Sequence, residues 1–251
     1  MHQVSWQIVT NTPRIASGDL HVWRYRLEFP AERVGEAESL LSADELARAD
    51  RFHFPIHRHR YVAGRSKLRK LLGGYLQVAP ASVRFTYSEF GKPAINRAQN
   101  SGTINFNVSH SEDICVVAVS HAQSLGVDVE RIRSDFGGEE VAQVNFAPAE
   151  FRELLSLPPH IRPQGFFNCW TRKEAYVKAL GAGLQIPLDG FEVSLRPEDP
   201  TRFLRGAEAE WHLLSFCGAD GFQAAAAYRG PEARVHFYEF AENDFASSNV
   251  T

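Results

Sequence analysis

The sequence predicts an α+β protein built from two similar halves, each with a small antiparallel sheet packed with helices. Two observations support this class. The expected elements run strand, helix, helix and three strands, and the same order then recurs after residue 125. No low-complexity linker separates the two runs. We therefore place one half at residues 1–124 and the other at residues 125–251.

The first half is expected to begin with a strand at residues 19–29, where the residues alternate and aromatic side chains are frequent. A helix should follow Ser42, which can form a capping box with Glu45. A longer helix should cover residues 57–72 and stop at the glycine pair 73–74. The remaining strands are expected at 82–88, 103–109 and 114–120, with a loop at 89–95.

The second half is expected to begin with a strand at residues 125–130, which should continue an antiparallel meander with the two strands before it. Helices follow near 148–156 and 164–180. Three more strands are expected near 190–195, 210–216 and 222–228. A site between two such halves is a natural place for a ligand.

Composition excludes several classes of function. The net charge is −3, so no global field attracts nucleic acid or an anionic membrane. The segment 48–70 is nevertheless locally basic, which suits a ligand that carries phosphate. The three cysteines are far apart, and no signal peptide or membrane-spanning stretch is evident. We expect a cytoplasmic protein in a reducing compartment.

Two acids stand in the segment GVDVE at 126–130, where a strand is expected. Val127 and Val129 should point to one side, and Asp128 and Glu130 to the other. Carboxylates that share a face suit a hard cation such as Mg²⁺. The alternative is a half-exposed strand whose polar face meets solvent.

Three further groups could carry chemistry, and each has a structural alternative. Glu174 and Lys178 lie one turn apart on a helix, where they could simply form a surface ion pair. Ser109 and His110 end a strand and could bind phosphate, although a lone histidine at a turn is more often structural. Lys92 lies in a turn and could simply face solvent. No G-x-S-x-G motif supports a serine hydrolase.

The order of four motifs is more specific than any one of them. FGKP at 90–93 is followed by FNVSHS at 106–111, GVDVE at 126–130 and WTRKEAYVKALGAGL at 170–184. This order resembles the 4′-phosphopantetheinyl transferases of the monomeric Sfp type, over roughly residues 45–195. The resemblance implies a monomer whose two α+β halves are related by a pseudo-twofold axis, with the active site between them.

The resemblance also implies a reaction. The phosphopantetheine arm of coenzyme A would move to a serine of an acyl or peptidyl carrier protein, and adenosine 3′,5′-bisphosphate would leave. Asp128, Glu130 and Glu174 match the acidic triad around Mg²⁺, for which Mn²⁺ is an alternative. Asp128, Glu174 and Lys178 would be catalytic. Glu174 would act as the base or mainly as a metal ligand, and Lys178 would reach the phosphates.

The remaining matches concern coenzyme A. By resemblance, Arg60 and His110 would hold its 3′-phosphate, and Lys92 and Ser109 would lie near the adenosine and its phosphates. Arg48 matches a further basic contact. Glu45 departs from the family pattern, because a basic residue is expected there. The segment 134–165 would face the carrier protein.

Two rival functions use some of the same residues. A metal-dependent phosphohydrolase or nuclease would explain the three acids but does not need the Ser-His turn or the basic helix. A non-catalytic module that binds coenzyme A or a nucleotide would not need a complete acidic set. The sequence leaves open whether the carrier serves fatty acid, polyketide or non-ribosomal peptide synthesis.

Overall fold

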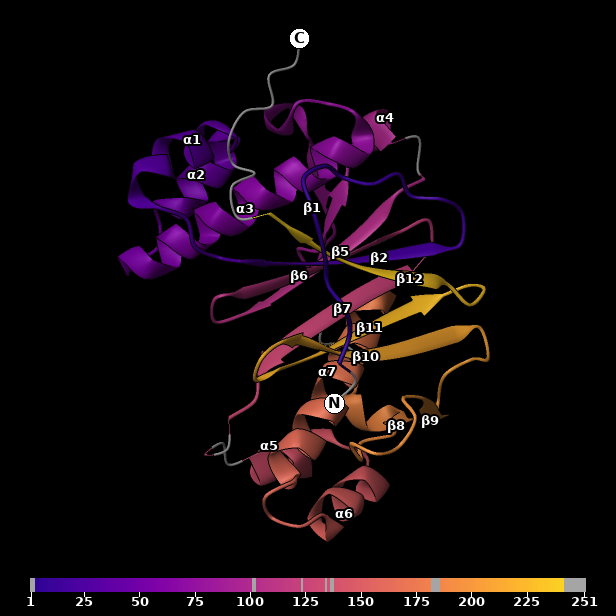
Figure 1. The fold of residues 1–251 in the computed structure, drawn as a ribbon. Helices are drawn as coiled ribbons and strands as arrows, with labels where there is room; N and C mark the ends of the chain where they lie inside the picture. Colours follow the sequence, from indigo (N-terminus) through magenta and orange to yellow (C-terminus); the bar gives the residue numbers. More distant parts are fainter. Residues whose placement is uncertain are drawn as a thin grey trace.

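The computed structural model describes residues 3–100, 103–122, 124–133, 135, 138–181 and 186–241. Two main sheets form its centre (Figure 1). The larger orders its strands as β1 (Gln7–Val9), β12 (Arg234–Phe240), β2 (Asp19–Arg26), β6 (Ile114–Ser120) and β5 (Asn105–Ser111). The smaller orders them as β10 (Trp211–Ala219), β11 (Phe222–Arg229) and β7 (Ser124–Arg131). The α+β class with two halves is confirmed.

The two sheets pack face to face, and a long helix covers the outer side of each. Val22 and Val116 of the larger sheet belong to the same apolar cluster as Val127 of the smaller one. On the other side of the larger sheet, Trp23 packs with Leu72 of α3 (Pro55–Leu76). Helix α7 (Arg162–Leu180) covers the outer side of the smaller sheet. We call the junction of the two sheets, where β5 meets β7, the seam. It lies between the two layers formed by α3 and α7.

In the first half, β2 and α2 (Ala43–Ala49) lie where the sequence predicts them. The backbone N–H of Ser42 donates to Glu45 Oε2 at 3.0 Å, which confirms the capping box. The predicted stop at residues 73–74 is wrong, because α3 continues to Leu76 and ends at Gln77, whose φ is 55°. Gly74 serves close packing instead, since an added Cβ would collide with Thr12.

The predicted meander is only half right. Strands β5 and β6 pair as an antiparallel hairpin, but β7 leaves them and pairs with β11 of the other sheet. The strand predicted at 82–88 shortens to β3 (Phe85–Tyr87), after a 3-10 turn at Pro80–Ser82. Its partner β4 (Pro93–Ile95) lies in the segment predicted to be a loop.

In the second half, α6 (Pro148–Ser156) matches its prediction, and α7 begins two residues early. Strand β8 (Glu192–Val193) is short and pairs with β9 (Phe203–Arg205). The unexpected strand β12 comes from the end of the chain but pairs in parallel with β2. A strand from beyond residue 125 therefore completes the larger sheet, which otherwise consists of strands from the first half. The division of the chain into two halves at residue 125 stays a prediction.

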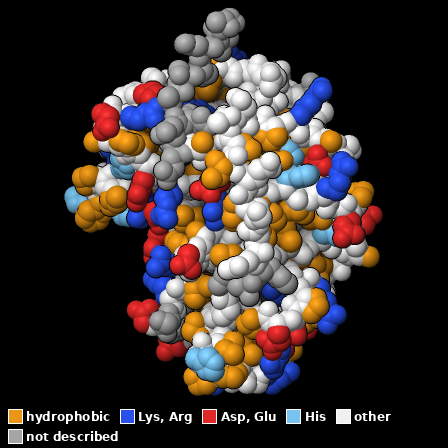
Figure 2. Space-filling model, viewed as in Figure 1, with side chains coloured by type: hydrophobic (Ala, Val, Ile, Leu, Met, Phe, Trp, Pro, Cys, Tyr) orange, Lys and Arg blue, Asp and Glu red, His pale blue; other side chains and the backbone are white. Residues whose placement is uncertain are grey.

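The remaining elements lie at the two ends of the molecule (Figure 1). They are a 3-10 turn at Ala31–Arg33, α1 (Val34–Ser39), α4 (Arg97–Asn100), α5 (Gly138–Asn145) and a 3-10 turn at Leu188–Gly190. On the face in Figure 2, basic and acidic side chains are interspersed. Among the described helices, none combines the length and the hydrophobicity that crossing a bilayer requires.

Candidate active site

Side chains of β5 join the edges of the two sheets. Because β7 is the edge strand of the smaller sheet, its free edge is held by polar side chains of β5 and not by a backbone ladder. Four contacts make this connection: Val127 N donates to Asn107 Oδ1 (2.9 Å), Ser109 Oγ to Asp128 Oδ1 (2.9 Å), Ser111 Oγ to Glu130 Oε2 (2.8 Å), and Arg131 N to Ser111 Oγ (3.1 Å). Alternate residues of FNVSHS thus hold two backbone N–H groups and both acids of β7.

Helix α7 crosses β7 at Gly126. A Cβ at this position would collide with the carbonyl oxygen of Ala175 and the backbone N–H of Ala179. Only glycine therefore lets the helix approach the strand so closely. The close crossing brings Glu174 and Lys178 of α7 over the polar face of β7.

Asp128 is the centre of the seam. It is 3% exposed, and its Oδ1 accepts hydrogen bonds from Lys178 Nζ at 2.6 Å and from Ser109 Oγ. Lys178 Nζ also donates to Ser109 Oγ at 2.9 Å. The other oxygen, Oδ2, is buried and has no hydrogen-bond partner in the structure. A buried carboxylate oxygen without a partner is costly, so this atom needs an explanation.

The other two acids carry charge that their surroundings do not neutralise. Burial raises the pKa of Glu174, and the negative charge of Asp128 raises it further. The same two causes, in the same order, raise the pKa of Glu130. Lys178 opposes both shifts, and Arg133 also opposes that of Glu130, but the pKa of each glutamate is still raised. Such an excess of oxygen ligands fits a hard divalent cation, which would also give Asp128 Oδ2 a partner.

The three acids do not yet form a closed set of ligands. Among the described residues, one trio of metal-binding side chains has its ligand atoms within 4.8 Å of one another, and it consists of Asp19, His21 and His236. The three acids of the seam are not within this spacing.

Basic groups gather beside the acids. Desolvation lowers the pKa of His110, and the positive charges of Lys178 and Arg60 lower it further, so both cations lie within electrostatic range of the imidazole. Arg60 comes from α3, and its Nε is buried without a hydrogen-bond partner among the described residues. A guanidinium beside an imidazole and an ammonium is suited to a phosphate group.

Lys92 connects the two halves. Its Nζ donates to the carbonyl oxygen of Leu125 at 3.1 Å and to that of Lys178 at 2.5 Å. Burial lowers its pKa, so the solvent-facing alternative is wrong. A cation at the C-terminal end of α7 also complements the helix dipole. The lysine of FGKP therefore has a structural role whether or not it also contacts a ligand.

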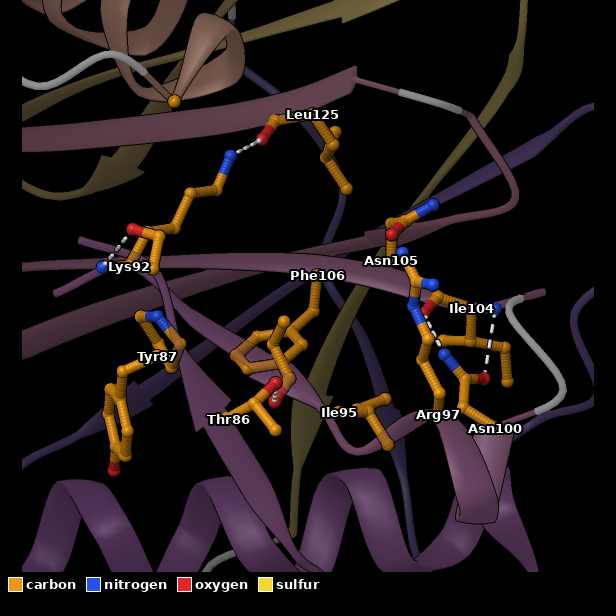
Figure 3. A pocket seen from close by; sticks show the side chains of 14 residues that line it. Thr86, Tyr87, Lys92, Ile95, Arg97, Asn100, Ile104, Asn105, Phe106 and Leu125 are labelled. Atoms are coloured by element: carbon orange, nitrogen blue, oxygen red, sulfur yellow. Dashed lines mark hydrogen bonds between the residues drawn. The ribbon is translucent and has the colours of Figure 1, made fainter. Parts of the chain in front are cut away.

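A cavity of about 740 Å³ opens beside Lys92. Figure 3 shows Lys92 and Tyr87 at one end, and Arg97 and Asn105 at the other. Phe106 contributes an apolar surface between these ends. An aromatic floor with polar groups at both ends is the composition of a site for a small molecule.

The structure does not bring every predicted residue to the seam. Arg48 is exposed on α2, with its guanidinium 5.6 Å from the ring centre of Tyr61. Glu45, the departure from the family pattern, is buried and bound by Arg65 and by Arg69, whose Nε donates to Oε2 at 2.6 Å. Glu45 therefore stabilises the packing of α2 on α3.

Two contributors to the seam were missed at the sequence level. Asn107 and Ser111 bind β7 on either side of Ser109. The alternation of polar residues in FNVSHS was the available signal. It was read as a phosphate-binding turn, but it is also the polar edge of a strand.

Comparison with known proteins agrees with these observations. Residues 31–122 match the family model described as 4′-phosphopantetheinyl transferase, N-terminal. Residues 124–227 match the model described as the 4′-phosphopantetheinyl transferase superfamily. The second match includes the whole of β7 and α7, and the first includes α3 and β5.

Three curated relatives carry the same description. The 4′-phosphopantetheinyl transferase HetI of Nostoc sp. is 40% identical over 241 residues, which cover 96% of this chain and 100% of the relative. Psf-1 of Bacillus pumilus is 28% identical over 82% of this chain and 86% of its own length. Sfp of Bacillus subtilis is 29% identical over 64% of this chain and 69% of its own length. This chain therefore belongs to the 4′-phosphopantetheinyl transferase family of enzymes.

Proposed function

We propose that the protein moves the phosphopantetheine arm of coenzyme A to a serine of an acyl or peptidyl carrier protein, with Mg²⁺ as its metal, and releases adenosine 3′,5′-bisphosphate. The observation that carries this proposal is the seam itself. A surplus of acids around Asp128 lies directly beside the basic group of Arg60, His110 and Lys178. Phosphoryl transfer needs a cation site and phosphate-binding groups side by side.

Asp128, Glu130 and Glu174 would hold the divalent cation, with Mn²⁺ as an alternative to Mg²⁺. When bound, the cation would neutralise charge on the pyrophosphate of coenzyme A. Lys178 has three N–H donors, and Asp128 and Ser109 account for two of them. The third supports a contact from Lys178 to a phosphate oxygen.

Glu174 is the candidate base. A serine hydroxyl is a weak nucleophile until a base takes its proton. Because burial and the charge of Asp128 raise the pKa of Glu174, its carboxylate is a stronger proton acceptor than an exposed glutamate. A role mainly as metal ligand remains the alternative for this residue.

The nucleotide would lie between the basic group and the cavity beside Lys92. Arg60 and His110 would hold the 3′-phosphate. Ser109 and Lys92 would lie near the adenosine and its phosphates. The arrangement supports this assignment because Lys92 borders both the cavity and the end of α7 that carries Lys178.

The carrier protein would dock on α5 and α6. Phe146 and Leu154 of the predicted segment are buried core residues, and Phe151 packs partly against the same core. Val144 is 77% exposed and Leu155 is 37% exposed, so these two side chains offer apolar surface to a partner helix. Three free cysteines support a reducing, cytoplasmic setting, and the family supports a monomer.

Intact-protein mass spectrometry tests the proposal. The protein is mixed with an apo carrier protein, coenzyme A and Mg²⁺, with an EDTA control. We expect the carrier to gain the mass of one phosphopantetheine arm and EDTA to prevent the gain. Cleavage of coenzyme A without modification of any carrier would favour the phosphohydrolase. Binding of coenzyme A without any reaction would favour the binding module.

A further inference from the structure

A second cluster of ligand atoms lies on the larger sheet, away from the seam. Asp19 and His21 alternate on β2, and His236 lies opposite His21 on β12, in parallel register. All three side chains lie on the same face, with their ligand atoms within 4.8 Å of one another. His21 Nε2 is 3.9 Å from Asp19 Oδ2, and His236 Nε2 is 3.7 Å from Asp19 Oδ1.

We propose that Asp19, His21 and His236 bind a divalent transition-metal ion such as Zn²⁺ or Co²⁺. Tetrahedral coordination with bonds of about 2.1 Å separates neighbouring ligand atoms by about 3.4 Å. The distances from His21 and His236 run to different oxygens of Asp19, at 3.9 and 3.7 Å, and one ligand atom from each residue lies within 4.8 Å of the other two. Two imidazoles and one carboxylate suit these ions better than they suit Mg²⁺.

His21 points its Nε2 towards Asp19, and its other ring nitrogen has a polar partner. Its Nδ1 lies 2.6 Å from the hydroxyl oxygen of Tyr75, which also accepts a hydrogen bond from Trp23 Nε1 at 2.8 Å. A ligating histidine commonly donates its other ring N–H to such an oxygen, which fixes the ring.

Arg234 opposes a cation at this cluster. Its Nε donates to Asp19 Oδ1 at 3.0 Å, so it competes for a ligand oxygen. The arginine side chain is 70% exposed and can turn towards solvent, whereas Asp19 is anchored by the backbone N–H of Ala16. An ion here would tie β12, from the end of the chain, to β2 near its beginning.

This site is distinct from the seam. Ser109 aligns with Val116 and therefore with Arg24, five residues along β2 from Asp19. At about 3.3 Å per residue, that offset is about 17 Å along the strand. Two strands, β6 and β2, also separate β5 from β12.

Co²⁺ titration of the tag-free protein, followed by visible absorption, tests the site in excess Mg²⁺, which would compete for the acids of the seam. We expect one Co²⁺ per chain, unchanged binding in Asp128→Ala, and a higher melting temperature on binding. His236→Ala, whose side chain is half-exposed in the wild type, should raise the Kd about tenfold or more. The exposed His160→Ala is the matched control and should leave the Kd unchanged.

Arg234→Met provides a test in the opposite direction, because removal of the competing cation should lower the Kd. Circular dichroism checks that each variant is folded. Absence of a Co²⁺ spectrum in the wild type would overturn the proposal. Equal binding by the wild type and His236→Ala would also overturn it. Neither result depends on transferase activity.

Discussion

Two lysines of α7, five residues apart, form ion pairs of opposite character. Lys173 pairs with Glu150 at 2.8 Å, with the two side chains 0% and 1% exposed. Its Nζ also donates to the carbonyl oxygens of Leu188 and Phe191, at 2.7 and 2.6 Å. Glu150 accepts from the backbone N–H groups of Ala147 and Val193. Every polar group of this closed pair has partners.

We call the pair of Lys178 with Asp128 the open pair, because its hydrogen-bonding groups are not all satisfied. Asp128 Oδ2 has no hydrogen-bond partner among the described residues, and Glu130 and Glu174 add negative charge that Lys178 and Arg133 offset only in part. Burial is the largest cause of the raised pKa of both Glu150 and Glu174. Lys173 then opposes this shift at Glu150, whereas Asp128 adds to it at Glu174. A satisfied buried pair serves the fold, and an unsatisfied one beside a cavity indicates function.

Asp128→Ala should break the open pair with the largest effect on activity. We expect the rate of carrier modification to fall by about 10³–10⁴-fold, because a cation ligand and the partner of Lys178 are lost together. The melting temperature should stay near that of the wild type, since repulsion from Glu130 and Glu174 also falls. Mass spectrometry and calorimetry measure the two quantities. Glu140→Gln, an exposed acid of α5, is the control. Normal turnover in Asp128→Ala would remove the metal assignment.

Lys173→Met should break the closed pair and show the reverse pattern. A buried Glu150 without its lysine should cost about 3–5 kcal/mol of unfolding free energy. At temperatures where the variant remains folded, activity per folded molecule should change little. Urea unfolding followed by circular dichroism gives the free energy. A stable but inactive variant would show that Lys173 takes part in the reaction. It would contradict the assignment of a purely structural role to the closed pair.

Glu174→Gln sharpens the comparison by separating charge from shape. If Glu174 is the base, the rate should fall about 100-fold with little change in the affinity for coenzyme A. A carboxyl group whose pKa is higher in the folded chain destabilises that chain once the pH exceeds its unfolded-state pKa. The amide removes this cost, so the variant should gain melting temperature at neutral pH and gain less at acidic pH.

Melting curves between about pH 5 and pH 8 check the stability part of this prediction. The control is Glu153→Gln on α6, where the carboxylate pairs with Arg196 and is half-exposed. A loss of stability at neutral pH in Glu174→Gln would show that the Glu174 carboxylate is satisfied. The acids around Asp128 would then already have the partners they need without a cation.

The faces of the seam could be predicted from sequence, because they depend on local periodicity. Alternation in GVDVE places Val127 in the core and Asp128 opposite it, and one helical turn separates Glu174 from Lys178. The partner of β7 could not be predicted, because β11 lies far along the chain and pairing between distant strands has no local signal.

The partners of two charged residues could not be predicted, for a related reason. Lys92 binds backbone carbonyls of β7 and α7, and carbonyls are not visible in a residue pattern. Glu45 was compared with a family pattern, but its carboxylate accepts hydrogen bonds from Arg65 and Arg69 on the next helix. Long side chains take partners that only the tertiary structure defines.

Arg60→Ala extends the comparison to the basic side of the open pair. Its buried Nε without a partner corresponds to Asp128 Oδ2 among the acids. We expect the KM for coenzyme A to rise about tenfold, because a charge-assisted hydrogen bond to phosphate is lost. The KM for dephospho-coenzyme A should change little. Equal losses with both substrates would contradict a 3′-phosphate contact. Arg205→Ala, an exposed arginine paired with Glu192, is the control.

Arg48→Ala should give the smallest effect. It tests whether the phosphate-binding group extends beyond Arg60, His110 and Lys178. Arg48 is exposed and lies over Tyr61, and no contact in the structure joins it to His110 or Arg60. An exposed charge typically contributes about 0.2–1 kcal/mol, so the KM for coenzyme A should rise less than about fivefold. Raised salt should reduce even this difference, because exposed charges are screened. A loss as large as that of Arg60→Ala would mean that α2 moves towards the seam when coenzyme A binds. Coenzyme A would then assemble part of its own phosphate site. The closed pair of Lys173, in contrast, is complete without a ligand.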